Sequence, residues 1–157
     1  PTNCISGGPQ ASDISSEAAV VMENSTNTVL YSKNADEVLF PGSTVKIMTC
    51  LLALENAQLT DQVTMTATGV SGVTDGGASI SSQVDEVFTV EQCLYAIMVA
   101  SANDIALQIA EHVGGSVDNF VQMMNSRAQE LGCTNTHFPT PMVFTTIIIT
   151  PVPTIWR

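Results

Sequence analysis

Hydrophobic and polar residues alternate in two short segments near the start of the chain and then follow a helical repeat. The alternation covers residues 17–23 and 28–32, and the Asn and Thr residues between them favour a turn, so we predict an antiparallel hairpin. Residues 60–88 are rich in Thr, Ser, Gly and Val and predict an irregular region with short strands. Apolar residues at helical spacing predict four helices, over residues 43–56, 90–99, 104–113 and 117–131.

Capping residues support the ends of these helices. Thr89 and Gln92 form a capping-box pattern before the second helix, Ser116 is a suitable N-cap for the fourth, and Gly132 is its expected stop. The first two helices are apolar around most of their circumference, so we expect both to be buried. A hairpin followed by helices is typical of an α+β fold rather than of alternating α/β units.

Size and charge narrow the possible functions. A chain of 157 residues with 45% hydrophobic and 12% charged residues suits one domain with a substantial core. The formal net charge of -11 argues against nucleic acid and against anionic membrane surfaces as partners, since both require clustered bases. The four basic residues are Lys33, Lys46, Arg127 and Arg157.

The cysteines give no sign of a metal site. Four are present, without CxxC or Cys/His spacing, so we expect no zinc. Cys50 and Cys93 lie in apolar helical segments, where a small buried side chain is the better interpretation, although an even count would permit disulfides in a secreted protein. Residues 1–16 are interpreted as a leader or linker, and no signal peptide or membrane-spanning run is visible.

Ser43 and Lys46 are the first candidates for catalysis. A serine hydroxyl attacks carbonyls only when a nearby group takes its proton, and a spacing of three residues places both side chains on one helix face. The helix N-terminus and burial would both lower the pKa of the lysine, as a neutral-lysine base requires. The alternative is a capping serine followed by a surface lysine.

Ser101 and Asn103 are the second pair of candidates. They lie in the break between two apolar helices, where polar side chains need partners and where the wall of a cleft is expected. The alternative, which is the better one for this pair taken alone, is that they merely cap the following helix.

Taken together, the SxxK and SxN motifs resemble the active-site-serine, penicillin-binding family, most closely its low-molecular-weight D-alanyl-D-alanine carboxypeptidases. Further similarity is carried by residues 29–49, 88–116 and 120–138. The resemblance implies a β-lactamase/transpeptidase-like fold of the α+β class, present as its N-terminal portion over residues 17–138. In that portion we expect the hairpin and the helical part, without the later strands of the sheet.

The resemblance also implies roles for individual residues. Ser43 would attack the carbonyl between the two terminal D-alanines of a peptidoglycan stem peptide, with Lys46 as its base. Ser101 would relay a proton to the leaving D-alanine, and Asn103 would bind the substrate amide and help orient Lys46. β-Lactams would be trapped at the same serine, in the cell envelope outside the cytoplasmic membrane. No metal or other cofactor is implied, and His112 and His137 have no role in this scheme.

The chain also departs from the family pattern. The third motif, Lys-Thr-Gly, is absent, so we expect these 157 residues alone to be inactive or weakly active. Two alternatives stay open: a class A-like β-lactamase, although Ala102 stands where that class usually has Asp, and a non-catalytic penicillin-sensing or cell-wall-binding domain. Any membrane anchor is expected outside this chain.

Residues 139–157 form an aberrant tail, of which residues 142–157 match nothing in the family. One back-translation of residues 142–157, read from its third base, encodes GLHDDNHYTSAYDMA, which resembles the segment that follows "NTHF" in the family. We therefore interpret the tail as the product of a frameshift between about Phe138 and Met142, and we expect it to be loosely placed beside an exposed sheet edge. The alternative is a genuine divergent strand, since residues 147–149 are all Ile.

Overall fold

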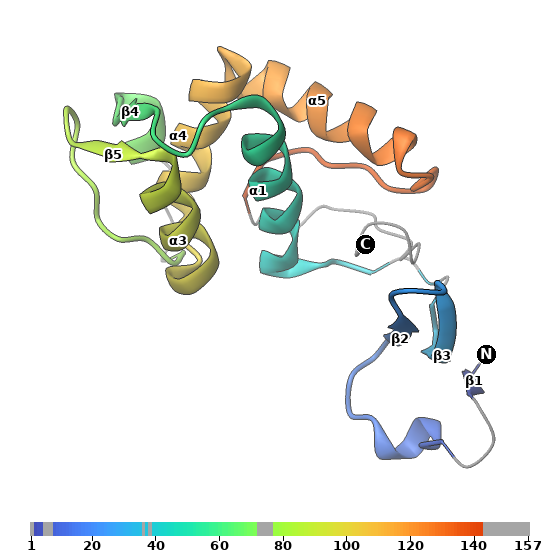
Figure 1. Cartoon of the computed structure of the whole chain (residues 1–157). Coiled ribbons are helices and arrows are strands. Elements are labelled where there is room, and N and C mark those ends of the chain that lie inside the picture. The colour runs from blue at the N-terminus through green and yellow to red at the C-terminus, as the bar shows by residue number, and fades with distance from the viewer. Residues whose placement is uncertain (1, 5–7, 36, 38, 72–76, 143–157) are drawn as a thin grey trace.

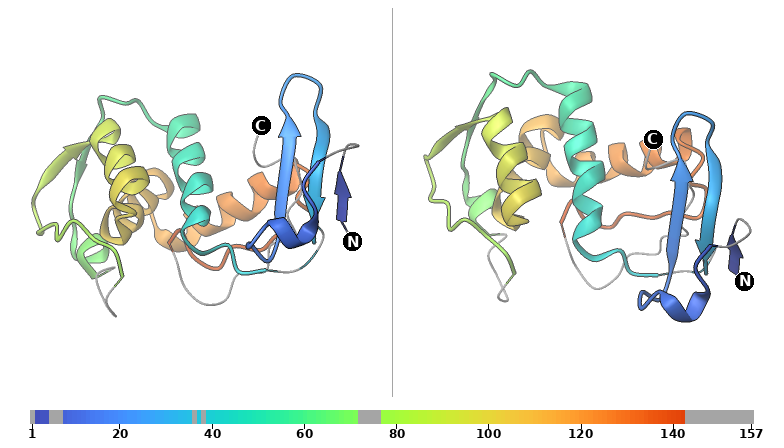
Figure 2. Two further views of the ribbon diagram at one scale, coloured as in Figure 1. Left: turned by 90° about the horizontal axis from the view of Figure 1, so that it is seen from below. Right: turned by 60° about the horizontal axis from the view of Figure 1, so that its bottom comes forward.

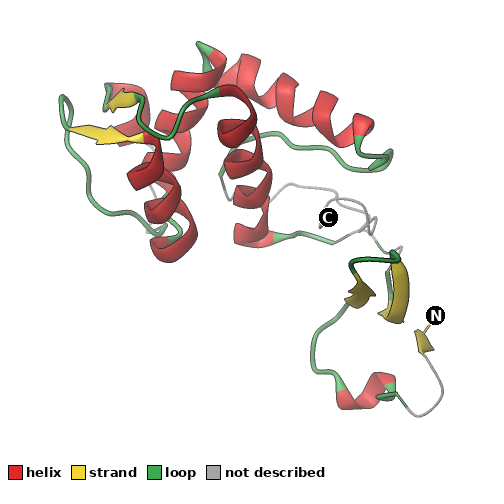
Figure 3. Cartoon of the chain, viewed as in Figure 1, coloured by secondary structure: helices red, strands yellow, loops and turns green. Residues whose placement is uncertain are grey.

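A computed structural model of the protein describes residues 2–4 (backbone only), 8–35, 37, 39–71 and 77–142. A small sheet lies beside a group of helices (Figure 1), and two further views show the same separation (Figure 2). Most helices form one group with a short strand pair beside them, and the other strands form the separate sheet (Figure 3), as expected for an α+β fold.

The predicted hairpin is confirmed. It consists of β2 (Ala19–Glu23) and β3 (Thr28–Lys33), which pair antiparallel with an irregularity at Val21/Met22. Its turn is organised by Glu23, whose carboxylate accepts hydrogen bonds from the hydroxyls and backbone N–H groups of Ser25 and Thr26. These hydrogen bonds, that of the Thr26 hydroxyl above all, lower the pKa of Glu23 to about 2.

The segment interpreted as a leader contributes a third strand, which the sequence analysis did not predict. β1 (Thr2–Cys4) pairs antiparallel with the free side of β3, giving the strand order β1-β3-β2. A short 3-10 helix, η1 (Ala11–Asp13), follows. Lys33 on β3 donates hydrogen bonds to the carbonyls of Ile14 (2.8 Å) and Ser16 (2.7 Å), and so ties this segment to the sheet.

The four predicted helices are all present, with small shifts at their ends. The first begins with a 3-10 turn, η2 (Gly42–Thr44), rather than with a regular helix at residue 43. The helices are α1 (Val45–Asn56), α3 (Val90–Ala100), α4 (Asn103–Gly114) and α5 (Val117–Glu130). Between α1 and α3 lie β4 (Gln62–Thr64), the short α2 (Ala67–Val70) and β5 (Val87–Thr89), with β4 and β5 paired antiparallel.

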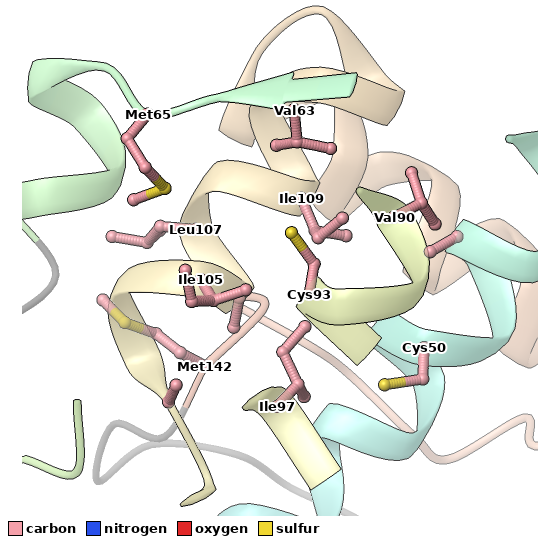
Figure 4. Packing of buried hydrophobic residues seen from close by; sticks show 13 residues of the cluster. Cys50, Val63, Met65, Val90, Cys93, Ile97, Ile105, Leu107, Ile109 and Met142 are labelled. Atoms are coloured by element: carbon pink, nitrogen blue, oxygen red, sulfur yellow. The ribbon is translucent and has the colours of Figure 1, made fainter. Parts of the chain in front are cut away.

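Helix α4 lies between two hydrophobic clusters and contributes to both. One cluster packs α4 against α3, β4 and part of α1, and its side chains converge in Figure 4. The other packs α4 against α1 and α5, around Phe120 and Met124. Each large side chain that is fully buried in this way stabilises the fold by about 1.5–3 kcal/mol. α4 therefore fixes α1 and α3 relative to each other.

Cys50 and Cys93 are buried in the first of these clusters as free thiols, as the sequence analysis proposed. Burial raises the pKa of Cys50 to about 11 and that of Cys93 to about 12, so both thiols stay protonated at neutral pH.

The expectation that α3 is largely buried was wrong. Only Val90, Cys93 and Ile97 are buried, while Tyr95 is 66% and Val99 is 83% exposed. The reason is that α1, α4 and β5 cover α3 on one side only. An apolar composition did not reveal which face had a partner.

The tail begins in contact with the core. The Thr49 hydroxyl donates a 2.7 Å hydrogen bond to the carbonyl of Pro141, and Met142 is buried in the first cluster. Pro141 and Met142 are therefore packed, contrary to the expected loose placement of the tail. The expectation for residues 143–157 lies outside the described residues.

The capping box of α3 provides a test of local stability. The Thr89 hydroxyl accepts a 3.2 Å hydrogen bond from the N–H of Gln92, whose side chain accepts a 2.8 Å bond from the N–H of Thr89. Thr89→Ala should lower the free energy of unfolding by about 1 kcal/mol, measured by urea denaturation. Thr89→Ser keeps the hydroxyl and should cost clearly less, so equal losses in the two variants would contradict the capping role.

Candidate active site

Ser43 lies at the start of a largely buried helix yet remains exposed itself. It is the middle residue of η2, immediately before α1. Gly42 precedes it with φ +59°, a left-handed conformation that glycine adopts without steric cost. The hydroxyl therefore combines solvent access with the positive potential of a helix N-terminus.

Lys46 has the opposite environment. It lies in the first turn of α1 and is only 2% exposed, between residues that belong to the core. Burial of an amine disfavours its charged form, and this desolvation lowers the pKa of Lys46, while the carboxylate of Asp104 acts in the opposite sense. A lowered pKa raises the neutral fraction, which is the form that can accept a proton.

Ser101 forms the turn between α3 and α4. It caps α3 in the left-handed conformation with φ 56°, which costs a residue other than glycine about 1–2 kcal/mol. Such conformations persist where the surrounding structure holds them, often at functional sites. Here the turn directs both the carbonyl and the hydroxyl of Ser101 toward α1.

The three side chains form one hydrogen-bonded chain. Lys46 Nζ donates to the carbonyl oxygen of Ser101 (2.5 Å) and to its Oγ (2.9 Å), and Ser101 Oγ donates to Ser43 Oγ (3.0 Å). The structure has no direct hydrogen bond between Ser43 and Lys46. The hydroxyl of Ser101 thus lies between the residues that the sequence analysis paired as nucleophile and base.

Asn103 lies two residues after Ser101 in the chain but makes no hydrogen bond to the three side chains of this group. Its backbone N–H donates a 2.8 Å hydrogen bond to the carbonyl of Ala78, and its side-chain oxygen is buried without a partner among the described residues. A Cβ atom on Gly77 would lie 2.5 Å from the Asn103 amide nitrogen, so only glycine fits there without displacing the amide. No hydrogen bond joins Asn103 to Lys46, whose Nζ donates to Ser101.

The sequence analysis gave no role to two residues next to this group, Asp104 and Ser82. Asp104 follows Asn103 directly and is fully buried, and its carboxylate accepts hydrogen bonds from Ser82. The one available signal in the sequence was an acidic residue directly after the SxN motif.

His112 and His137 are exposed and take no part in the group.

Comparison with known proteins identifies the family. The family model for D-alanyl-D-alanine carboxypeptidases matches residues 6–145. The chain is 39% identical over 141 residues to the D-alanyl-D-alanine carboxypeptidase DacF of Bacillus subtilis, covering 85% of this chain and 36% of the relative. It is 36% identical over 134 residues to a Streptomyces D-alanyl-D-alanine carboxypeptidase, covering 80% of this chain and 46% of the relative.

Solved structures agree on the fold. Penicillin binding protein 5 from Haemophilus influenzae superposes with a TM-score of 0.82 at 26% identity, covering 94% of this chain and 44% of that one. The D-alanyl-D-alanine carboxypeptidase of Mycobacterium tuberculosis gives a TM-score of 0.86 at 23% identity, covering 98% and 59% respectively. The predicted fold, that of the penicillin-binding carboxypeptidases, is therefore confirmed.

Two further facts limit what these similarities cover. The chain spans 36% and 46% of the two curated relatives named above, so it corresponds to part of their length. Residues 146–157 lie outside the family match. Because the family match nevertheless includes most of the chain, the chain belongs to the D-alanyl-D-alanine carboxypeptidase family.

Proposed function

We propose that the chain carries the nucleophile of a serine-type D-alanyl-D-alanine carboxypeptidase, with Ser43 forming the acyl-enzyme. The hydrogen-bonded chain from the buried Lys46 through Ser101 to the exposed Ser43 carries this proposal. It joins a desolvated amine to a solvent-accessible hydroxyl, which is the arrangement that activates a serine. The capping-serine alternative does not account for a lysine buried against Ser101.

In the proposed mechanism, the proton of Ser43 moves through Ser101. As Ser43 Oγ attacks the carbonyl carbon, its proton passes to Ser101 Oγ, and the proton of Ser101 passes to neutral Lys46. The reverse transfer protonates the leaving amine when the peptide bond breaks. Water then hydrolyses the ester on Ser43. The N–H groups at the start of α1 are available to stabilise the developing oxyanion.

The proposed substrate follows from the relatives. They are named D-alanyl-D-alanine carboxypeptidases, and one structural neighbour is a penicillin binding protein. We therefore propose a peptidoglycan stem peptide ending in D-Ala-D-Ala as substrate and β-lactams as inhibitors. Asn103, with its unpartnered side-chain oxygen at the site, is proposed to bind the substrate amide.

Such a substrate places the protein in the cell envelope, outside the cytoplasmic membrane. In the described part of the chain, the helices are too short or too polar to span a membrane. Since the 157 residues lack Lys-Thr-Gly, we propose that they are weakly active or inactive without that segment. We also propose that the tail arises from a frameshift that begins between about Phe138 and Met142.

The assignment of the nucleophile is tested by acylation. In a form of the protein that also carries the family's Lys-Thr-Gly segment, fluorescent penicillin should label the wild type, and Ser43→Ala should remove labelling because no other hydroxyl lies at that position. Ser12→Ala, a change at an exposed serine of η1, is the matched control and should label normally. A penicillin adduct in the intact mass of Ser43→Ala would disprove the assignment.

The role of Lys46 is tested by pH dependence. The acylation rate should rise with pH through the pKa of Lys46, because only the neutral amine accepts a proton. Lys46→Met retains volume and should slow acylation by about 100-fold or more and abolish this pH limb. Lys33→Met, the matched control at the other lysine, should keep both rate and pH limb. A pH limb unchanged in Lys46→Met would assign it to another group.

The origin of the tail is tested by the nucleotide sequence. Read from the third base of the Met142 codon, the DNA should encode GLHDDNHYTSAYDMA or a close variant. Codons for residues 142–157 that cannot give that reading would establish a genuine divergent tail instead.

A further inference from the structure

The loop segment 77–82 packs against the start of α4. The carbonyl of Ala78 accepts the N–H of Asn103 at 2.8 Å. Four residues later, the backbone N–H and hydroxyl of Ser82 donate to Asp104 Oδ2 at 3.1 and 2.7 Å. The segment 77–82 is thus held by the two residues that follow Ser101 and Ala102.

Asp104 is an unusual residue to find in this position. It is 0% exposed and lies in the first turn of α4, yet it forms no salt bridge within the described structure. Its second oxygen, Oδ1, accepts no hydrogen bond. A buried carboxylate destabilises the folded state unless its charge is compensated, so a role other than stability is needed to explain why an aspartate lies here.

The charge of Asp104 is preserved despite its burial. Burial raises the pKa of this carboxyl, but the hydroxyl and N–H of Ser82, the nearby Ser79 hydroxyl and the N–H of Ile105 outweigh that effect and lower it below the usual value. The N-terminal end of α4 further favours the anion. Asp104 is therefore a carboxylate at neutral pH.

Lys46 is the amine on which this charge acts. Its burial lowers the pKa of Lys46, and Asp104 raises it. Other charged groups on the helices around α1 are directed elsewhere: Glu111 accepts hydrogen bonds from Thr66 and Thr68, and Arg127 pairs with Glu55 and Glu130. The remaining acidic and histidine side chains of these helices are exposed, namely Glu91, His112 and Asp118.

We propose that Asp104 is a positioning residue, which fixes the segment 77–82 against the turn at residues 101–103. The same residue places a buried negative charge three residues after Ser101, whose carbonyl and hydroxyl accept hydrogen bonds from Lys46 Nζ. The inference rests on the proposed function of Lys46 as the base. Through Ser82, Asp104 holds the segment that also binds the backbone of Asn103. Through its charge, Asp104 opposes the effect of burial and keeps the pKa of Lys46 from falling too far. An amine with too low a pKa is a poor proton acceptor.

The charge is tested directly on Lys46. The chain has two lysines, Lys33 and Lys46, so ¹³C labelling at lysine Cε gives two titrating NMR signals, assigned with Lys33→Met. Asp104→Asn keeps the shape and an acceptor for Ser82 but removes the charge, and should shift the titration midpoint of Lys46 downward. Asp85→Asn makes the same change at an exposed aspartate and should leave the midpoint in place.

The same variants connect the charge to reactivity. In a form with the Lys-Thr-Gly segment, the acid limb of the penicillin acylation profile should move to lower pH in Asp104→Asn, by the shift seen for Lys46, and should not move in Asp85→Asn. An unshifted Lys46 midpoint in Asp104→Asn would overturn the inference. A shifted midpoint with an acid limb that stays in place would instead contradict Lys46 as the base and leave the charge of Asp104 established.

The positioning part has its own variant, which also covers a failure of Asp104→Asn to fold. Ser82→Ala removes one donor to the carboxylate and keeps the charge. Hydrogen exchange of the Asn103 N–H, bonded to Ala78, should become faster, while the Lys46 midpoint should move less than it does without the charge. An unchanged exchange rate at Asn103 would show that Asp104 and Ser82 do not hold the segment.

Discussion

The site depends on one contact, in which Lys46 of α1 reaches the turn at Ser101 between α3 and α4. A lysine that is almost fully buried must find acceptors, because an unpaired amine in the core costs several kcal/mol, or else lose its proton. Ser101 supplies two acceptors, a carbonyl and a hydroxyl. The contact therefore joins the exposed nucleophile position to a turn 55 residues further along the chain.

The two hydrophobic clusters make this contact possible. Both clusters include α4, so α1 and α3 cannot shift independently of each other. The turn before α4 therefore keeps a fixed position relative to α1. Within this frame the protein tolerates features that would otherwise destabilise it: a left-handed Ser101, a buried side-chain oxygen of Asn103 without a partner, and the buried Asp104. Departures from local rules that gather in one place are typical of functional sites.

Most of the fold could be predicted because its signals are local. The hairpin followed from alternation around a polar turn, and α3 and α5 began where Thr89 and Ser116 cap them. Two features escaped prediction because they depend on distant partners. β1 is a strand only through its pairing with β3. One apolar face of α3 stays exposed because no described element packs against it. Composition carries no information on either.

The site divides in the same way. The sequence alone determined that Ser43 and Lys46 lie together at the start of an apolar helix. It also determined that Ser101 and Asn103 lie where one apolar helix ends and the next begins. Both features depend only on residues that are neighbours in the chain. Only the tertiary structure decided that Ser101 lies between Ser43 and Lys46, and that the buried carboxylate of Asp104 accepts hydrogen bonds from Ser82. Hydrogen-bond order and burial arise from how helices dock, and docking is set by packing between segments far apart in the chain.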